Sequence, residues 1–318
     1  MLDCEKMVEY VSLVRAALIV LVPLTIGILA RYLKFPKIVF KSMYLLVLWV
    51  AMPALVFGVI AVKHANVFDL GATAVLALIG LGVTAVLSSF IASDYKMNKE
   101  RSTAIFLNSC FMNYTFVGLA VVYAVLPGVR DALGIASMYA VAMGIAHLTV
   151  GVALAASSGR KEVSPREVAL SILTFPAAFA MIVALIFVAF NVGFSVQHQN
   201  MVDMFTLPVL VLMLLAAGYQ MPMFDPRKYI DVIAIVGAIR LVICPVFTFF
   251  AILLLGYTAT PVANTSMILA IMPPGIFNLI LAQKFGLDLK MYGAIIFYLT
   301  IASLFIALPW MVILLNLV

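Results

Sequence analysis

Polar side chains are concentrated at residues 108–115 of an otherwise apolar stretch. Buried amides and hydroxyls need hydrogen-bond partners, so they either join neighbouring helices or bind a ligand. Taken alone, this segment favours the interhelical role. The side chains concerned are Asn108, Ser109, Asn113 and Thr115.

A second apolar stretch is interrupted at residues 272–278. Pro273 and Pro274 remove two backbone donors, and Gly275 permits unusual dihedral angles. We therefore expect a true break in the helix rather than a simple proline kink. Irregular backbone at membrane depth is tolerated where protein buries it or a cavity receives it. Asn278 follows the break and is a candidate binding residue.

Two ionisable side chains lie well inside apolar stretches. His147 either carries a proton, because imidazole titrates near neutral pH, or stays neutral and bonds a backbone carbonyl. Arg240 either attracts a carboxylate or extends its long stem to the cytoplasmic interface, and we favour the second role. No Asp or Glu lies in the middle of a stretch, which argues against a carboxylate proton relay or an acidic cation cage.

The composition restricts the class of protein that can contain these segments. Of 318 residues, 66% are hydrophobic and 10% are charged, whereas soluble domains have about 45–50% and about 25%. This excludes a disordered chain, a nucleic-acid-binding module and an ordinary soluble enzyme. Catalytic motifs and metal-ligand spacings are absent, and the cysteines Cys4, Cys110 and Cys244 are not paired. We expect neither an enzyme nor a cofactor.

The apolar residues fall into ten stretches, each long enough for a membrane-spanning helix of about 20 residues. Their lack of a two-residue period argues against a β-barrel. The first is expected to be a retained span rather than a signal peptide. The sequence therefore predicts an all-α polytopic membrane protein with ten spans at about 11–30, 39–61, 70–92, 102–126, 131–156, 168–191, 201–220, 230–256, 263–285 and 290–316.

Charge sets the expected orientation of these spans. Most of the 19 Lys and Arg residues lie in the loops that follow odd-numbered spans, whereas Lys63 and Arg130 lie in the opposite loops. The positive-inside rule then places both termini on the non-cytoplasmic side. The net charge of +6 is consistent with this bias and with contact to anionic lipid, so we expect no nucleic-acid partner.

The most polar linker, residues 156–167, divides the chain into halves 1–155 and 168–318. Five spans per half make any internal repeat an inverted one. Residues 48–56 resemble residues 204–210, each with one proline, and residues 102–118 can be aligned with 266–282. Because its repeat partner is broken, we expect span four to be broken as well.

Two broken helices can cross near the middle of the membrane. Their half-helix N-termini then present amides and positive dipole ends that suit an anion, and their C-terminal carbonyls suit a cation. Asn113 and Asn278 are expected at this crossing, where they bind substrate by hydrogen bonds.

Four motifs resemble the auxin efflux carrier family, which includes plant auxin carriers and bacterial malate or malonate permease-like proteins. The last motif is the most specific. The family's pattern in span four usually contains a further Gly and a Pro, whereas this chain has Thr115 and Ala120 near those positions. The motifs are Met52-Pro53-Ala54-Leu55 within residues 45–57, Asn113 with Phe116-x-Gly118-Leu119, Arg240-Leu241 with Pro245, and Met272-Pro273-Pro274 leading to residues 281–286.

The resemblance implies the fold of bile acid sodium symporters, with two inverted five-helix repeats and crossed helices four and nine. It implies a scaffold domain of spans 1, 2, 6 and 7, a transport domain of spans 3–5 and 8–10, a homodimer formed through the scaffold, and elevator-like alternating access. It also implies that Asn113 and Asn278 lie at the site of a substrate that is usually an organic carboxylate.

We therefore expect a secondary carrier of a small organic anion in the cell membrane. The site is expected to comprise Asn108, Ser109, Asn113, Thr115, Pro273, Pro274, Gly275 and Asn278, with a proton or anion role for His147 and Arg240. The coupling ion is H+ or Na+. Alternatives are a sodium-coupled symporter of the bile acid type, a non-transporting sensor, and an intramembrane enzyme that uses His147.

Overall fold

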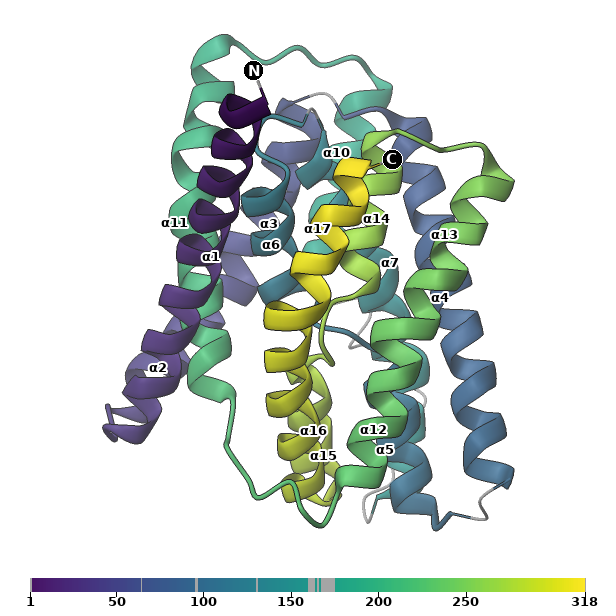
Figure 1. The fold of residues 1–318 in the computed structure, drawn as a ribbon. Helices are drawn as coiled ribbons and strands as arrows, with labels where there is room; N and C mark the ends of the chain where they lie inside the picture. Colours follow the sequence, from purple (N-terminus) through teal and green to yellow (C-terminus); the bar gives the residue numbers. More distant parts are fainter. Residues whose placement is uncertain are drawn as a thin grey trace.

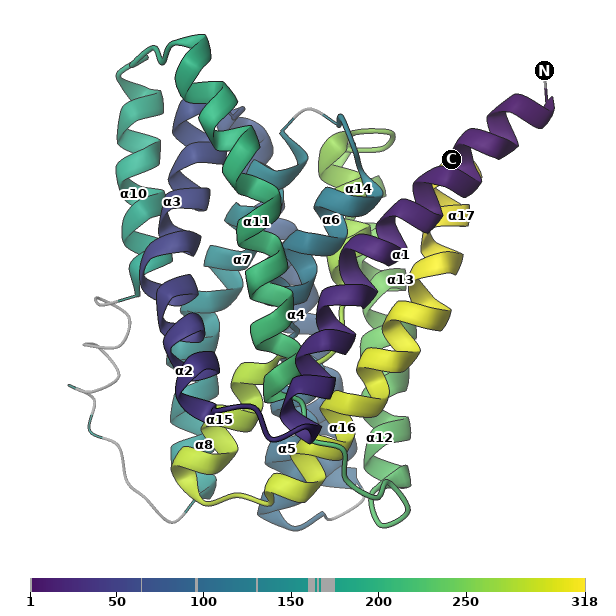
Figure 2. The ribbon, with the colours of Figure 1, turned by 90° about the vertical axis from the view of Figure 1, so that its left-hand side faces the viewer.

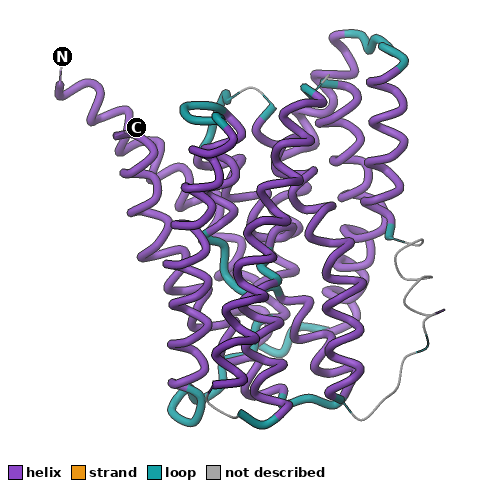
Figure 3. The backbone as a smooth tube through the Cα atoms, turned by 90° about the vertical axis from the view of Figure 1, so that its right-hand side faces the viewer, coloured by secondary structure: helices purple, strands orange, loops and turns teal. Residues whose placement is uncertain are grey.

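The computed structural model describes residues 2–63, 65–94, 97–129, 131–159, 164, 166 and 175–317. Throughout this part of the chain the regular elements are helices, and the β structure consists of one isolated bridge between Met112 and Pro274 (Figures 1 and 3). The predicted linker at 156–167 and the beginning of the sixth predicted span lie largely outside the described residues.

The first half of the chain forms long helices that contain short π-helical segments, labelled η. Its elements are α1 (Leu2–Tyr32), α2 (Lys37–Leu46), η1 (Val47–Ala51), α3 (Met52–Phe57), η2 (Gly58–Val62), α4 (Val67–Asp94), α5 (Lys99–Cys110), η3 (Tyr114–Gly118), α6 (Leu119–Val125), α7 (Ala132–Ala146), η4 (His147–Gly151) and α8 (Val152–Ser158).

The described part of the second half is also helical and contains two π-helical segments. Its elements are α10 (Pro176–Ala189), α11 (Val196–Gln220), α12 (Ile230–Gly237), η5 (Ala238–Ile243), α13 (Cys244–Leu255), α14 (Pro261–Ala270), α15 (Ile276–Phe285), α16 (Leu289–Ala302), η6 (Ser303–Ala307) and α17 (Leu308–Leu317).

Six of the described helices are long and apolar enough to cross a membrane. They are Lys37–Val62, Val67–Ser93, Ala132–Ser158, Val196–Gln220, Ile230–Leu255 and Leu289–Leu315. Shorter apolar helices lie at Ala17–Tyr32, Tyr114–Val125, Pro176–Ala189 and Ile276–Phe285. Within the described residues the structure is helical and consistent with a polytopic membrane protein, while the count of ten spans and the inverted repeat stay predictions.

Three of the π-helical segments end two residues before a proline. The prolines are Pro53, Pro245 and Pro309, which follow η1, η5 and η6. A proline cannot donate to the carbonyl four residues earlier, and its ring displaces that carbonyl. A widened turn before the proline is a local way to accommodate this loss, and such turns often occur at functional sites.

Close backbone contact joins α1 to α11, two helices that lie side by side in Figures 1 and 2. A Cβ atom on Gly218 would lie 2.1 Å from the carbonyl oxygen of Leu24, and one on Gly27 would lie 2.3 Å from that of Leu215. Glycine at both positions therefore lets the two helices approach more closely than side chains would permit.

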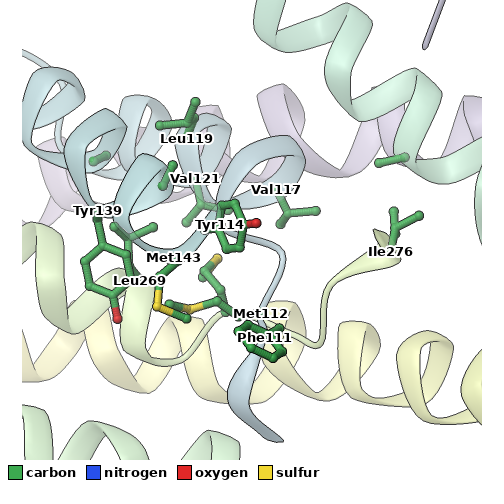
Figure 4. Close-up of a cluster of buried hydrophobic side chains, with 14 of the residues drawn as sticks. Phe111, Met112, Tyr114, Val117, Leu119, Val121, Tyr139, Met143, Leu269 and Ile276 are labelled. Carbon is green, nitrogen blue, oxygen red and sulfur yellow. The ribbon is translucent and has the colours of Figure 1, made fainter. Parts of the chain in front are cut away.

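Buried side chains gather where two extended segments pass each other between helices. Figure 4 shows Phe111, Met112 and Tyr114 on one segment, with Ile276 following the other. Phe111 and Met112 are at most 1% exposed. The core of the described chain therefore surrounds the two places where the helices are interrupted.

Candidate functional site

The helix of span four is interrupted at residues 111–113, and that of span nine at 271–275. On one side α5 ends at Cys110 and η3 begins at Tyr114, and on the other α14 ends at Ala270 and α15 begins at Ile276. Both predicted breaks are confirmed. The break in span four, which has no proline, is explained by its pairing with the other segment.

The two extended segments are joined by an antiparallel bridge. The main-chain N–H of Asn113 donates to the Pro273 carbonyl at 2.7 Å, and the main-chain N–H of Gly275 donates to the Phe111 carbonyl at 2.8 Å. Pro273 and Pro274 have no N–H to donate, so the second hydrogen bond of the bridge comes from the N–H of Gly275. A Cβ on Gly275 would lie 2.9 Å from the Met112 carbonyl oxygen, so a larger residue would push the segments apart.

This crossing separates the polar ends of four half-helices. The helices α5 and α14 end at the crossing with their C-terminal carbonyls. The helices η3–α6 and α15 begin there with their N-terminal turns. A helix carries about half a positive charge at its N-terminus and about half a negative charge at its C-terminus. One set of ends therefore suits an anion and the other a cation.

Asn278 fastens the start of α15 to the end of α5. Its side chain is completely buried, and its amide nitrogen lies 3.1 Å from the Leu107 carbonyl, 3.0 Å from the Phe111 carbonyl and 3.2 Å from the Asn108 side-chain oxygen. Asn108 is itself anchored, because its amide donates to the Ala104 carbonyl. The donor capacity of Asn278 is therefore taken up by the protein.

His147, in η4, completes this buried network. Its Nε2 lies 2.8 Å from the Oδ1 of Asn278, and its Nδ1 lies 3.4 Å from the Tyr114 hydroxyl. Because the Asn278 nitrogen faces carbonyl acceptors, its oxygen accepts and Nε2 is assigned as the donor. The imidazole stacks on Phe111 with ring centroids 4.1 Å apart and meets the edge of Phe277.

A cavity of about 200 Å³ lies against the crossing. Its polar lining includes Asn113, Thr115 and His147, and its backbone lining includes Gly275. The remaining wall is largely aromatic and apolar, and the described residues that line it include no Asp or Glu. That wall comprises Tyr44, Leu48, Trp49, Met52, Met112, Tyr114, Phe116, Gly144, Leu148, Phe175, Pro176, Ile276, Phe277 and Ile280.

Asn113 differs from Asn278 in its hydrogen bonds. Its side chain is only 4% exposed and borders the cavity, and its amide nitrogen has no hydrogen-bond partner among the described residues. An unsatisfied buried donor costs about 1–3 kcal/mol. This donor is therefore the group of the site best placed to gain from a bound acceptor.

Arg240, in η5, does not extend to the interface as predicted from its position in the sequence. It is 1% exposed, and its guanidinium lies among the carbonyl oxygens of Ser109, Leu269, Ala270 and Met272 at 3.0–3.4 Å. The prediction failed because carbonyl oxygens of both interrupted helices, which tertiary packing brings together, surround the guanidinium inside the protein.

The structure thus brings all the predicted site residues to the crossing but divides them into two groups. Asn113, Thr115, Gly275 and His147 line the cavity, whereas Asn108, Ser109, Pro273, Pro274, Asn278 and Arg240 lie outside its lining. The hydroxyl of Ser109 is also buried without a partner among the described residues.

Sequence reasoning missed the aromatic components of the site. Tyr114, Phe111 and Phe277 surround the imidazole, and Tyr44 and Trp49 border the cavity. The only available signal was the aromatic content of residues 111–116, which is unremarkable in an apolar chain. A larger cavity of about 600 Å³, lined by Lys63 and Asp203, contains none of the predicted residues.

Comparison with known proteins identifies one family. A family model described as membrane transport protein matches residues 14–311, a range that includes both interrupted helices and every residue of the cavity lining. No curated protein matches the chain.

Proposed function

We propose that this chain, which belongs to the auxin efflux carrier family of membrane transport proteins, is a secondary carrier of a small organic anion with a carboxylate group. The observation that carries the proposal is the buried side-chain amide of Asn113, which has no hydrogen-bond partner among the described residues and borders a cavity formed where two half-helices begin. An oxygen of the substrate would accept from this amide.

Two properties of the cavity favour an anion. The described lining has no Asp or Glu, the first turns of η3 and α15 border it, and helix N-termini attract negative charge. Its volume of about 200 Å³ lies below the 300–1,000 Å³ typical of drug-sized ligands, which favours a small carboxylate. The neighbouring hydroxyl of Thr115 offers a second hydrogen bond.

The composition of the cavity wall supports alternating access. One wall comes from spans two and six, through Tyr44, Trp49 and Phe175, and the other from spans four, five and nine, through Asn113 and His147. In this proposal spans 1, 2, 6 and 7 form a fixed scaffold that also forms a homodimer. Spans 3–5 and 8–10 move as a rigid transport domain in an elevator-like step, with both termini on the non-cytoplasmic side of the cell membrane.

Asn278 and His147 act in this mechanism by positioning. Asn278 holds the end of α5 against the start of α15. His147 donates to Asn278 and also lines the cavity. His147 is also the residue through which a proton would be coupled, since it is the imidazole of the described cavity lining and an imidazole can take up and release a proton. The substrate would therefore contact Asn113 directly and Asn278 through this network.

The proposal is tested by uptake of a panel of radiolabelled mono- and dicarboxylates into proteoliposomes. We expect saturable uptake of at least one small carboxylate, and at least a tenfold loss of kcat/KM for Asn113→Ala. Asn264→Ala is the matched control, because Asn264 lies in α14 but borders an outer apolar groove rather than the site. Uptake of none of the panel, or wild-type uptake by Asn113→Ala, would overturn the proposal.

A further inference from the structure

We infer that Arg240 is a built-in cation of the crossing: its guanidinium occupies the place where the carbonyl ends of two interrupted helices would otherwise require a bound monovalent cation. This inference rests on the proposed function only in its transport readout. Its structural part concerns how the crossing is held together and is independent of which substrate is carried.

The guanidinium bonds both helix ends at once. Nη2 donates to the carbonyls of Leu269 at 3.3 Å and Ala270 at 3.0 Å, which are the last two residues of α14. Nη1 lies 3.4 Å from the carbonyl of Ser109, in the last turn of α5.

The remaining contacts of Arg240 reach the crossing segments themselves. Nε donates to the Met272 carbonyl at 3.2 Å, and Nη2 also lies 2.6 Å from the thioether sulfur of Met112. Five acceptors from both interrupted helices therefore surround one planar cation, an arrangement that suits the fork of donors on arginine better than the single point charge of lysine.

No carboxylate compensates this charge among the described residues. The ion pairs found there join Lys63 to Asp203 and Arg101 to Asp231. A buried charge without compensation would be severely unfavourable. Two helix C-termini contribute about half a negative charge each, so together they balance a single guanidinium. Main-chain dipoles therefore replace the acidic partner that a buried arginine ordinarily needs.

The position of Arg240 on its helix makes this contact possible. It lies in η5, the widened turn that ends two residues before Pro245. A glutamine-like neutral side chain could reach the same region, but it has two donors rather than five and no charge. The combination of a π-helical turn and an arginine therefore places a fixed positive charge on the carbonyl side of the crossing, with the amide ends left facing the cavity.

This arrangement has two consequences for transport. A carrier that holds its own cation at the carbonyl ends has no need of sodium there, so wild-type uptake is expected to be equal in sodium and choline media. Removal of the guanidinium leaves a pocket lined by carbonyl oxygens and a sulfur, which a small soluble cation can enter. Arg240 is thus a positioning residue, and a soluble guanidinium ion that binds in the emptied pocket can replace its side chain.

The experiment measures the Tm of detergent-solubilised protein with millimolar guanidinium chloride, sodium chloride or choline chloride. We expect Arg240→Ala to lower Tm by roughly 5 °C or more, and guanidinium to restore most of this loss in a saturable manner, while choline does not. The Tm of the wild type should not change with guanidinium. Arg31→Ala is the matched control, because Arg31 donates to the Tyr219 carbonyl at an exposed site and its loss should create no guanidinium response.

Two further variants keep the test decisive if Arg240→Ala does not fold. Arg240→Gln keeps a hydrogen-bonding side chain without charge, and we expect it to show a lowered Tm that guanidinium raises. Arg240→Lys keeps the charge, and we expect a Tm between those of the wild type and Arg240→Gln. Wild-type Tm in Arg240→Gln, or no guanidinium response in either neutral variant, would overturn the inference.

Transport distinguishes failure of this inference from failure of the proposed function. Carboxylate uptake by Arg240→Gln should be lost in choline medium and recovered with guanidinium. A guanidinium-dependent Tm without any carboxylate uptake in the wild type would leave Arg240 as a built-in cation and refute the carrier of organic anions. Wild-type uptake that requires sodium would refute the inference and leave the carrier.

Discussion

The Nε2 of His147 lies 2.8 Å from the side-chain oxygen of Asn278, although 131 residues separate them in the sequence. This bond joins η4 to α15, and the Asn278 amide continues the connection to the last carbonyls of α5. Three elements from both halves of the chain are thereby held at one point beside the cavity. Asn278 and Asn113, which look alike in the sequence, consequently have different roles.

Asn278→Ala is predicted to lower both stability and transport. The substitution removes the amide that serves the carbonyls of Leu107 and Phe111 and leaves His147 Nε2 without its acceptor. Each unsatisfied buried group costs about 1–3 kcal/mol. We expect a Tm several degrees below that of the wild type, measured in detergent. In Asn113→Ala, by contrast, Tm should stay close to wild type, because the side-chain amide nitrogen of Asn113 has no partner to lose among the described residues. Equal Tm losses in the two variants would contradict this division of roles.

His147→Gln is predicted to retain most of the rate of substrate exchange measured at equal pH on both sides of the membrane. A glutamine amide can donate to Asn278 as the imidazole does, so the positioning role survives. His147→Phe fills the space between Phe111 and Phe277 but has no donor, and we expect at least a tenfold lower rate.

The same pair of variants addresses proton coupling. If His147 carries the coupled proton, His147→Gln loses uptake driven by a pH gradient while exchange at equal pH remains. Full gradient-driven uptake by His147→Gln would assign the imidazole to positioning alone, and loss of exchange would show that an amide cannot replace it.

Gly275→Ala is predicted to disturb the crossing. The new Cβ would lie 2.9 Å from the Met112 carbonyl oxygen, which belongs to rigid backbone and cannot move aside without weakening the bridge. Overpacking of this kind costs about 1–3 kcal/mol, so Tm and uptake should both fall. Gly82→Ala is the control, because a Cβ there meets nothing within 4 Å. A Tm for Gly275→Ala as high as that of Gly82→Ala would mean that the segments can separate freely.

The interruption of span nine could be predicted from the sequence because its cause is local. Pro273, Pro274 and Gly275 remove donors and relax dihedral limits wherever they stand. The break at 111–113 was predicted only by analogy with its repeat partner, and its physical cause is the pairing of Asn113 with Pro273. The family resemblance, drawn from these two segments and from the motifs at residues 45–57 and 240–245, is confirmed by the family model.

The direction of individual side chains could not be predicted in the same way. Arg240 was expected to extend towards the interface, but it lies buried in η5 against carbonyls of residues 109, 269, 270 and 272. Asn278 was expected to meet substrate, but contacts distant in sequence occupy its donors. Both outcomes depend on partners brought together by tertiary packing, which hydropathy and spacing do not encode.

The central claim is that the Asn113 amide receives the anion, and equilibrium binding of a transported carboxylate to Asn113→Ala and Asn113→Asp tests it most directly. Loss of one hydrogen bond to a charged ligand is worth about 1.5–3 kcal/mol, so Asn113→Ala should bind roughly 10- to 100-fold more weakly. Asn113→Asp adds a repelling charge and should show no measurable binding. Wild-type affinity in Asn113→Asp would contradict the account.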